Sequence, residues 1–244
     1  MTNVALIFPG QGAQAVGMGR EFYEASAEAK QVFDSADKAI NGLTDVIFNG
    51  PPEKLTSTAF CQPAIYTYSF AVLQALKAHS NFQKINPQFA AGLSLGELTA
   101  VAASGALSFE ATLRLIERRS FFMDEATRMK KGAMAAIVNL DKEKLIAVCQ
   151  KTGVEVANFN SPDQIVITGE AEKIEKASRM ITEQQIGRVI PLDVSGAFHS
   201  TLMQPAALRF EKELQNVDFQ TADFPVVSNV DGQPYVGSED IRDN

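Results

Sequence analysis

Apolar runs and helical patterns alternate along the first half of the chain. The run Val4–Phe8 predicts a buried strand, which Pro9 and Gly10 end sharply. Apolar residues at helical spacing predict helices over residues 20–40, 62–79, 97–103 and 108–127, and a short apolar run at 89–91 precedes the third of these. Strands that alternate with helices over short connections are typical of an α/β fold with a mostly parallel sheet.

The middle of the chain follows a different order. Strands are predicted at residues 133–138, 154–157, 165–168 and 188–192, and helices at 141–150 and 171–183. This β-α-β-β-α-β order is that of a ferredoxin-like unit. We therefore expect a ferredoxin-like subdomain over residues 129–194, inserted into a large α/β body formed by residues 1–128 and 195–244. The last part is predicted to contain a helix over 200–214, a strand at 226–228 and a turn at Asp231-Gly232.

The composition excludes several classes of protein. The chain has 244 residues, with 22 basic against 29 acidic side chains, and its formal charge of −7 argues against a general nucleic-acid binder. No apolar run approaches the ~18–20 residues of a membrane span, and the start of the chain lacks the basic region of a signal peptide. Cys61 and Cys149 lack the spacing of a metal site or a disulfide framework. We expect a cytoplasmic protein that binds neither nucleic acid nor a membrane.

Residues 92–96 read Gly-Leu-Ser-Leu-Gly, a G-x-S-x-G motif between a predicted strand and a predicted helix. A tight strand-to-helix turn presents the hydroxyl of Ser94, and the two glycines avoid side-chain collisions across that turn. The N–H of Leu95, directly after the serine, is then placed to donate to an oxyanion. The alternative is an ordinary serine at a glycine-rich helix N-terminus. The flanking strand and helix favour a catalytic nucleophile.

A serine nucleophile needs a base within hydrogen-bonding distance, and the chain contains two histidines. His79 closes a predicted helix in a polar context, which is typical of a solvated residue near a helix C-terminus. His199 follows a run of small residues just before a helix, where a loop can deliver an imidazole to a cleft. His199 is therefore the favoured base, with a partly buried structural histidine as the alternative.

Two further features bear on the chemistry of such a site. Gln11 follows the first strand, and loops at the carboxyl ends of parallel strands face a shared crevice, so its N–H is a candidate for a second oxyanion donor. Arg114, Arg118 and Arg119 lie on the helix after the serine, where one inward arginine can bind a carboxylate through two parallel hydrogen bonds. The spacing does not decide which of the three faces inward.

Together these motifs resemble those of the malonyl-CoA:acyl carrier protein transacylases and the related acyltransferase domains of polyketide and fatty-acid synthases. The resemblance spans essentially the whole chain and rests on the segments Phe8–Gly12, Gln62–Ala64, Gly92–Glu97, Gly132–Ile137, Asn158–Gly169 and Gly196–Ser200. It implies an α/β-hydrolase-like parallel-sheet body with an inserted ferredoxin-like subdomain. That fold agrees with the predicted order of strands and helices.

The resemblance also implies roles for the matching residues. Ser94 matches the nucleophile and His199 the general base, and the backbone N–H groups of Gln11 and Leu95 match the oxyanion hole. Arg119 matches the family arginine that holds the free carboxylate of malonyl.

Two more residues are implied to bind the substrate. Gln62 lies in one of the matching segments, and Phe198 beside His199 resembles the malonyl-selective version of that motif. Leu93 stands where the family more often has histidine, and Ser120 replaces the usual glycine after the arginine. We expect these departures to tune the pocket and to leave the chemistry intact.

The implied activity is ping-pong transfer of malonyl from malonyl-CoA to the phosphopantetheine thiol of an acyl carrier protein, in fatty acid biosynthesis, with no metal or tightly bound cofactor. The expected partners are the carrier protein and the coenzyme A thioester, and Arg128, Lys130 and Lys131 form a basic region that is a hypothesis for docking the acidic carrier. Family members continue for several dozen residues beyond Asn244, so the body is expected to miss a C-terminal segment that normally helps to orient the histidine. The alternatives are a serine thioesterase or esterase, and a non-catalytic module that binds the carrier protein.

Overall fold

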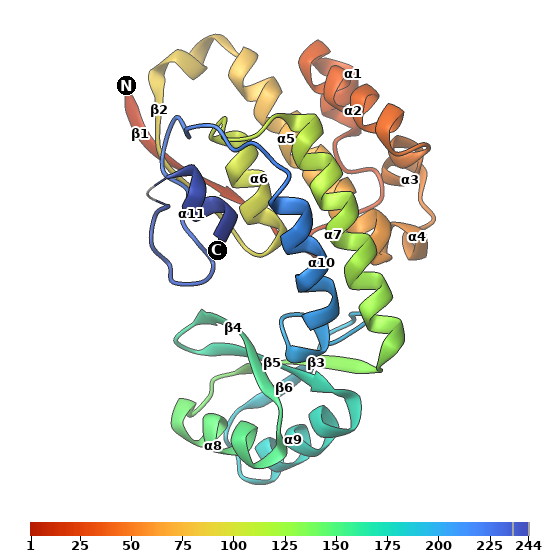
Figure 1. Ribbon diagram of the computed structural model, residues 1–244, viewed down its shortest axis with the longest axis vertical. Helices are drawn as coiled ribbons and strands as arrows, with labels where there is room; N and C mark the ends of the chain where they lie inside the picture. Colours follow the sequence, from red (N-terminus) through yellow and green to blue (C-terminus); the bar gives the residue numbers. More distant parts are fainter. Residues whose placement is uncertain (236, 244) are drawn as a thin grey trace. The chain divides into compact units, whose positions relative to one another are not determined.

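The computed structural model describes residues 1–235 and 237–243. The chain forms two compact units, of which the first comprises Met1–Ser120 and Lys212–Asn244 and the second Phe121–Glu211 (Figure 1). The chain leaves the first unit within helix α7 (Phe109–Met129) and returns to it within helix α10 (Gln204–Leu214), which follows a short 3-10 helix, η2 (Thr201–Met203). Each unit has its own sheet and its own buried apolar core.

The sheet of the first unit brings three strand ends to one edge. Strand β1 (Thr2–Phe8) pairs in parallel with β2 (Ile85–Gly92), so that Phe8 lies opposite Gly92. On the other side of β2, Val226 forms a parallel bridge with Ala90. The predicted strand at 226–228 is thus a single bridge, because the chain turns back at once and Val227 pairs with Pro234. The loops that follow these three segments all start from the carboxyl-terminal edge of the sheet.

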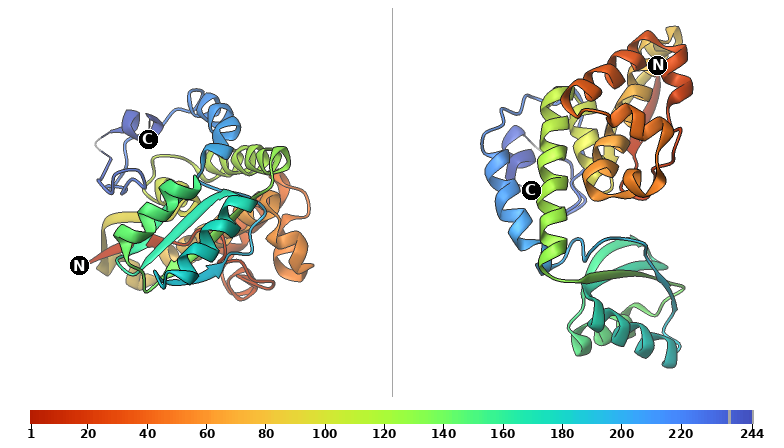
Figure 2. Two further views of the ribbon diagram at one scale, coloured as in Figure 1. Left: turned by 90° about the horizontal axis from the view of Figure 1, so that it is seen from below. Right: turned by 90° about the vertical axis from the view of Figure 1, so that its right-hand side faces the viewer.

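Helices make up most of the rest of the first unit. They are α1 (Arg20–Ala25), α2 (Ala27–Ala39), α3 (Leu43–Asn49), α4 (Pro52–Thr56), α5 (Thr58–Ala78), a 3-10 helix η1 (Ser80–Lys84), α6 (Leu95–Ala103) and α11 (Ser238–Asp243). Helix α5 packs against each of α1–α4 and against α6 (Figure 2). Its residues Ile65 and Tyr66 are fully buried. The core around α5 includes Phe33, Leu43 and Leu113.

Three local features of these helices differ from the predictions. The single helix predicted over 20–40 is wrong, because Ser26 ends α1 and its hydroxyl caps α2 by accepting a hydrogen bond from the N–H of Ala29. Helix α5 begins before the predicted start, so Pro63 lies inside it and removes one backbone donor. Helices α3 and α4 were not predicted, since elements of seven and five residues are too short to display a helical period.

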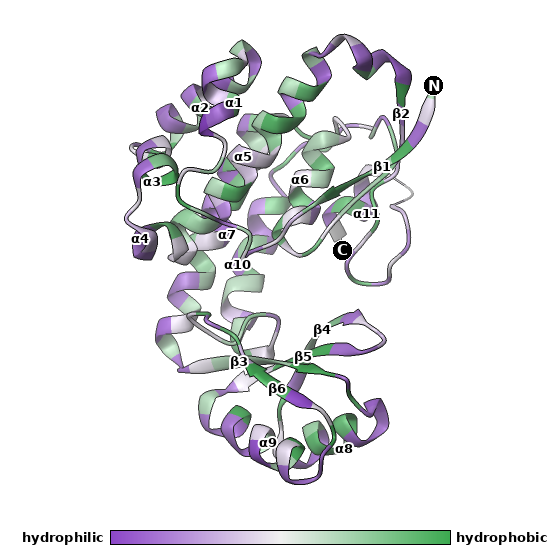
Figure 3. Cartoon of the chain, turned by 180° about the vertical axis from the view of Figure 1, so that it is seen from behind, coloured by the Kyte–Doolittle hydropathy of each residue, from purple (hydrophilic) through white to green (hydrophobic). Residues whose placement is uncertain are grey.

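The second unit has the predicted β-α-β-β-α-β order. Its elements are β3 (Gly132–Val138), α8 (Lys142–Thr152), β4 (Glu155–Ser161), β5 (Gln164–Glu170), α9 (Ala171–Glu183) and β6 (Arg188–Pro191). The strands form an antiparallel sheet in the order β4-β5-β3-β6, and β3 and β5 are apolar along most of their length (Figure 3). Ile137 and Ile167 of the sheet pack with Leu145 of α8 and Ile174 of α9 in a buried core.

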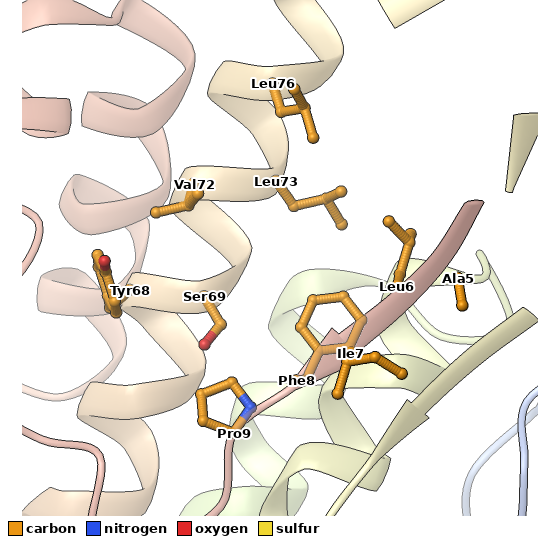
Figure 4. A pocket seen from close by; sticks show the side chains of 10 residues that line it. All are labelled: Ala5, Leu6, Ile7, Phe8, Pro9, Tyr68, Ser69, Val72, Leu73 and Leu76. Atoms are coloured by element: carbon orange, nitrogen blue, oxygen red, sulfur yellow. The ribbon is translucent and has the colours of Figure 1, made fainter. Parts of the chain in front are cut away.

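An apolar groove lies between β1 and α5 in the first unit. Figure 4 shows the side chains that line it: Ala5, Leu6, Ile7, Phe8, Pro9, Tyr68, Ser69, Val72, Leu73 and Leu76. None of these side chains is charged, and only Tyr68 and Ser69 among them carry a hydroxyl group. The polar residues that could carry chemistry lie instead at the loops that follow the strands.

Two features of residues 1–235 and 237–243 concern the general class of the protein. No helix in residues 1–235 and 237–243 is long and apolar enough to cross a lipid bilayer. Over the same ranges, no three His, Cys, Asp or Glu side chains gather closely enough to hold a metal ion. Cys61 and Cys149 are both buried free thiols, and burial raises the pKa of each to about 11.

Candidate active site

Ser94 lies at a sharp turn between a strand and a helix. Strand β2 ends at Gly92 and helix α6 begins at Leu95. The backbone of Ser94 has φ 53° and ψ −99°, a conformation that side-chain-bearing residues rarely adopt. This strained geometry is that of a nucleophile elbow, in which the serine hydroxyl is pushed out of the turn.

The glycines of the motif are required by close backbone contacts. A Cβ on Gly92 would lie 2.1 Å from the carbonyl carbon of Gly96, and one on Gly96 would lie 2.4 Å from the carbonyl oxygen of Phe8. A Cβ on Gly10, in the loop after β1, would lie 2.6 Å from the carbonyl oxygen of Leu93. Only glycine fits at these positions, and the loop that carries Gln11 therefore packs directly against the elbow.

The backbone donors predicted for an oxyanion hole belong to this packed region. Leu95 is the first residue of α6, and the first N–H groups of a helix have no intrahelical acceptor. Gln11 lies in a turn immediately after Gly10 and is partly buried. Their joint action on an oxyanion stays a prediction.

Arg119 and Gln62 extend the site from two helices. The guanidinium Nη2 of Arg119 donates to the hydroxyl Oγ of Ser94 over 2.8 Å, and Nη1 donates to Oε1 of Gln62 over 2.7 Å. Gln62 is almost fully buried on α5. Burial lowers the pKa of Arg119 to about 10, while the nearby carboxylate of Glu97 acts in the opposite direction. The site thus places a cation beside the serine hydroxyl.

The structure distinguishes the three arginines that the sequence left open. Arg114 is exposed, and Arg118 is paired through Nε with Oε1 of Glu213 at 2.9 Å. Arg119 alone of the three contacts Ser94. The helical spacing could not reveal this, because the inward face of α7 is set by packing in the buried core around α5, to which Leu113 and Ile116 belong.

Three residues that the sequence analysis did not single out also lie at the elbow. The side chain of Asn229 accepts a hydrogen bond from the backbone N–H of Ser94, and Glu97 is bonded to both Asn229 and Tyr235. A signal for Asn229 was present, because it directly follows the predicted strand at 226–228 and so belongs to the functional edge of a parallel sheet. Nothing in the sequence pointed to Tyr235.

His199 belongs to the second unit, where its loop is firmly held. Its backbone φ is 58°, so that it is, like Ser94, one of the few non-glycine residues with positive φ. The carbonyl of the preceding Phe198 accepts a hydrogen bond from Thr168 over 2.8 Å. A Cβ on Gly196 would lie 2.4 Å from Cγ2 of Thr127. Small residues therefore precede His199 because the loop packs tightly.

Phe198 is buried in the core of the second unit. It packs in a cluster with Phe122, Met134, Val166 and Met203. Ser94, Arg119 and Gln62 thus come together in the first unit, whereas His199 and Phe198 lie in the second. The pairing of Ser94 with His199, and contact of Phe198 with a substrate, stay predictions.

Comparisons with known proteins agree over the whole chain. Residues 5–240 match the acyl transferase domain family. The chain is 44% identical over 249 residues to the malonyl CoA-acyl carrier protein transacylase of Bacillus subtilis strain 168, covering 100% of this chain and 77% of that protein. The crystal structure of an acyl-carrier-protein-S-malonyltransferase from Bartonella henselae is similar with a TM-score of 0.91 at 36% identity, over 99% of this chain and 78% of the other.

A further similar structure includes a partner. It is a malonyl-transacylase in complex with a type II PKS acyl-carrier protein, with a TM-score of 0.92 at 35% identity, over 99% of this chain and 79% of that one. One family accounts for the strained G-x-S-x-G turn, for the arginine beside its serine, and for the similarities over nearly all of this chain. The chain belongs to the malonyl CoA-acyl carrier protein transacylases, within the acyl transferase domain family.

Proposed function

We propose that this protein transfers the malonyl group of malonyl-CoA to the thiol of an acyl carrier protein, as a step of fatty acid biosynthesis, through an acyl-enzyme on Ser94. The observation that carries the proposal is the contact between Arg119 and Ser94 at a strained elbow. The elbow supplies a nucleophile, and the cation selects an acyl group that carries its own negative charge. Family membership supports the same reaction.

In the first half-reaction, His199 takes the proton of the Ser94 hydroxyl as Oγ attacks the thioester carbonyl. The carbonyl π electrons move to oxygen, and the N–H groups of Gln11 and Leu95 stabilise the resulting oxyanion. Collapse of this intermediate breaks the C–S bond. The coenzyme A thiolate leaves with the proton from His199, and malonyl stays on Ser94.

In the second half-reaction, the phosphopantetheine thiol of the carrier protein attacks the acyl-serine. His199 takes the thiol proton and returns it to Oγ of Ser94 when the ester bond breaks. No metal or tightly bound cofactor enters either step, and the phosphopantetheine arrives on the carrier. Removing one oxyanion donor in comparable sites costs about 3–4 kcal/mol of transition-state stabilisation.

Arg119 recognises the free carboxylate of malonyl in this proposal. Its Nη2 is 2.8 Å from the Ser94 hydroxyl, so an acyl group on that oxygen begins within reach of the guanidinium. Gln62 accepts a hydrogen bond from Nη1 and so fixes the orientation of the planar guanidinium group. Phe198 is proposed to shape the acyl site from the second unit.

We also propose the finer description of the fold. The first unit corresponds to the α/β-hydrolase-like body, and the second contains the ferredoxin-like subdomain predicted over residues 129–194. The strand order β4-β5-β3-β6 and the two helices α8 and α9 support the latter assignment. The predicted boundaries fall 8 residues inside the start and 17 residues inside the end of the second unit, Phe121–Glu211.

The carrier protein is the proposed partner, and the basic region is the proposed contact for its acidic surface. Arg128 is paired with Asp124 at 2.5 Å and Lys130 with Glu170 at 2.8 Å, so two of the three cations are partly neutralised. Docking must therefore compete with these exposed pairs, each of which is worth at most about 1 kcal/mol. Charge reversal at Lys131 should raise the KM for the carrier protein and leave the KM for malonyl-CoA unchanged.

The test of function compares two acceptors. The protein is incubated with malonyl-CoA and either holo carrier protein or the same carrier without phosphopantetheine, and malonyl-carrier and free malonate are measured. Malonyl on the holo carrier alone supports the proposal. Free malonate as the main product with either carrier makes the protein a thioesterase, and binding of the carrier without any acyl transfer makes it a non-catalytic module.

A further inference from the structure

The turn at Ser94 is strained and must be held by its surroundings. A non-glycine residue in such a sparsely populated conformation is unfavourable by itself, so the neighbouring contacts have to stabilise it. The direction of Oγ and of the Leu95 N–H both depend on this one residue's φ and ψ. The groups that hold the turn therefore decide the geometry of attack.

The side-chain amide of Asn229 spans the turn. Its Oδ1 accepts from the backbone N–H of Ser94 over 2.6 Å, and its Nδ2 donates to the backbone carbonyl of Gly92 over 2.7 Å. One side chain thus bonds both residues that flank Leu93. Among side chains of this size, only the amide of asparagine combines a donor and an acceptor in this way at all ordinary pH values.

Strand pairing explains why a residue 135 positions away reaches the elbow. The N–H of Ala90 donates to the carbonyl of Pro225, and the N–H of Val227 donates to the carbonyl of Ala90. This parallel pairing brings the end of the 225–227 segment beside the end of β2. Asn229 follows two residues later, at the start of a tight return in which the N–H of Tyr235 donates to the carbonyl of Val226.

Asn229 is itself fixed by the start of helix α6. Its backbone N–H donates to Oε1 of Glu97 over 2.8 Å, and the hydroxyl of Tyr235 donates to the same oxygen over 2.6 Å. Glu97 lies in the first turn of α6, directly after the elbow. The loop that carries Asn229 is therefore hydrogen-bonded to Gly92 on the strand side of the turn and to Glu97 on the helix side.

We infer that Asn229 is a positioning residue, which holds Ser94 in its reactive backbone conformation by bonding the backbone of Gly92 and Ser94. Glu97 and Tyr235 in turn hold Asn229 in place. The inference rests on the proposed function, because it assigns Asn229 to the acylation of Ser94. Asn229 touches neither the hydroxyl nor the acyl group in this role. Its effect passes through the backbone alone.

Asn229→Asp is the most informative variant. It keeps the size of the side chain and the acceptor for the Ser94 N–H, but replaces the donor to Gly92 by a carboxylate oxygen that faces a carbonyl oxygen. Misplacement of reacting groups by about 1 Å costs about 100-fold in rate, so we expect acylation at saturating malonyl-CoA to fall about 10–100-fold with little change in KM.

Acid should partly rescue this variant. Protonation of the new carboxyl restores a donor to Gly92, and the neighbouring Glu97 carboxylate raises the pKa of that carboxyl. The other groups that face it are the hydroxyl of Tyr235 and, beyond Glu97, the guanidinium of Arg119. The rate of the variant divided by that of the unaltered protein should therefore rise as the pH falls from 8 towards 5.5, whereas a merely destabilised protein gives a ratio that is flat or falls.

The matched control is Asn216→Asp. Asn216 is exposed in the same unit, and its Nδ2 also donates to a backbone carbonyl, that of Lys212, over 2.8 Å. We expect this variant to acylate at the unaltered rate at every pH. Thermal unfolding of both variants reports any loss of folding separately from the loss of rate.

A second measurement does not depend on activity. Hydrogen exchange of the Ser94 N–H should be faster in Asn229→Ala than in the unaltered protein, while the N–H of Val227 in the adjoining strand pairing keeps its protection. Unchanged exchange at Ser94, or an Asn229→Asp variant that acylates normally, overturns the inference. Failure of the unaltered protein to form any acyl-serine overturns the proposed function instead, and the exchange measurement still decides the role of Asn229.

Discussion

The guanidinium of Arg119 donates to the hydroxyl of Ser94, with 2.8 Å between Nη2 and Oγ, although Ser94 lies in the turn before α6 and Arg119 lies on α7, 25 positions further along the chain. A cation this close to a nucleophile favours an acyl group that brings its own anion. The contact therefore places the proposed carboxylate-binding group beside the proposed nucleophile.

Replacing Arg119 by alanine tests that link. We expect the acylation rate with malonyl-CoA to fall by about 10–100-fold, the value of one charge-assisted hydrogen-bonded contact, and the rate with acetyl-CoA to change far less. Arg119→Lys should recover only part of the malonyl rate, since lysine keeps the charge without the two-pronged fork. Arg114→Ala, on the exposed side of the same helix, is the control. Equal losses with the two substrates in Arg119→Ala would reject the carboxylate contact.

The lowered pKa of Arg119 predicts an unusual pH dependence. Burial lowers this pKa to about 10, so the guanidinium loses its charge as the pH rises through that value and keeps it below. The ratio of malonyl to acetyl transfer should therefore decline as the pH passes about 10, measured as initial rates of acyl-serine formation. Using the ratio cancels losses common to both substrates. A ratio that stays constant to pH 11 contradicts the prediction. In Arg119→Ala, the ratio of malonyl to acetyl transfer should not change as the pH passes about 10.

His199 is the next residue to test, because Ser94 lies in the other unit. A general base contributes about 10²–10⁴-fold, and we expect His199→Ala to slow acylation by a factor in that range. His79→Ala is a matched control, since His79 is exposed and its Nδ1 merely accepts a hydrogen bond from the N–H of Asn81. Acylation of the His199 variant at the unaltered rate would show that another group takes the proton of Ser94.

Gly96→Ala should damage the first unit locally. The new Cβ would lie 2.4 Å from the carbonyl oxygen of Phe8, and backbone cannot give way as a flexible side chain does. Overpacking of this kind costs about 1–3 kcal/mol of unfolding free energy, and it should be accompanied by slower acylation. Gly237→Ala serves as the control, because its Cβ would meet nothing within 4 Å. Urea unfolding of the two variants gives the comparison.

Local patterns in the sequence predicted the elbow and the second unit well. The two glycines around Ser94 predicted a tight turn with close backbone contacts. Helix α9 begins and ends at the predicted residues, Ala171 and Glu183. The helix predicted over 108–127 corresponds to α7, and the hydroxyl of Ser108 caps it by accepting from the N–H of Ala111. These features depend on neighbours a few positions away, which is why a pattern could reveal them.

Contacts that depend on the pairing of distant segments could not be predicted from local patterns, although the position of Asn229 after a predicted strand was a signal. Asn229 meets the elbow only because residues 225–227 pair with β2, and no local pattern states which strands are neighbours. The choice of Arg119 over Arg118 likewise depends on distant residues, because Arg119 meets Gln62 and Ser94 whereas Arg118 pairs with Glu213. The break between α1 and α2 was not predicted, because the helical pattern is continuous there and the capping role of Ser26 does not interrupt it.

The proposed reaction requires that malonyl becomes covalently bound to Ser94. Mixing the protein with malonyl-CoA alone, followed by intact-mass measurement and peptide mapping, is the decisive experiment. We expect one added malonyl group, located on the peptide that contains Ser94 and absent from Ser94→Ala. A malonyl group on any other residue, or one that persists in Ser94→Ala, would contradict it.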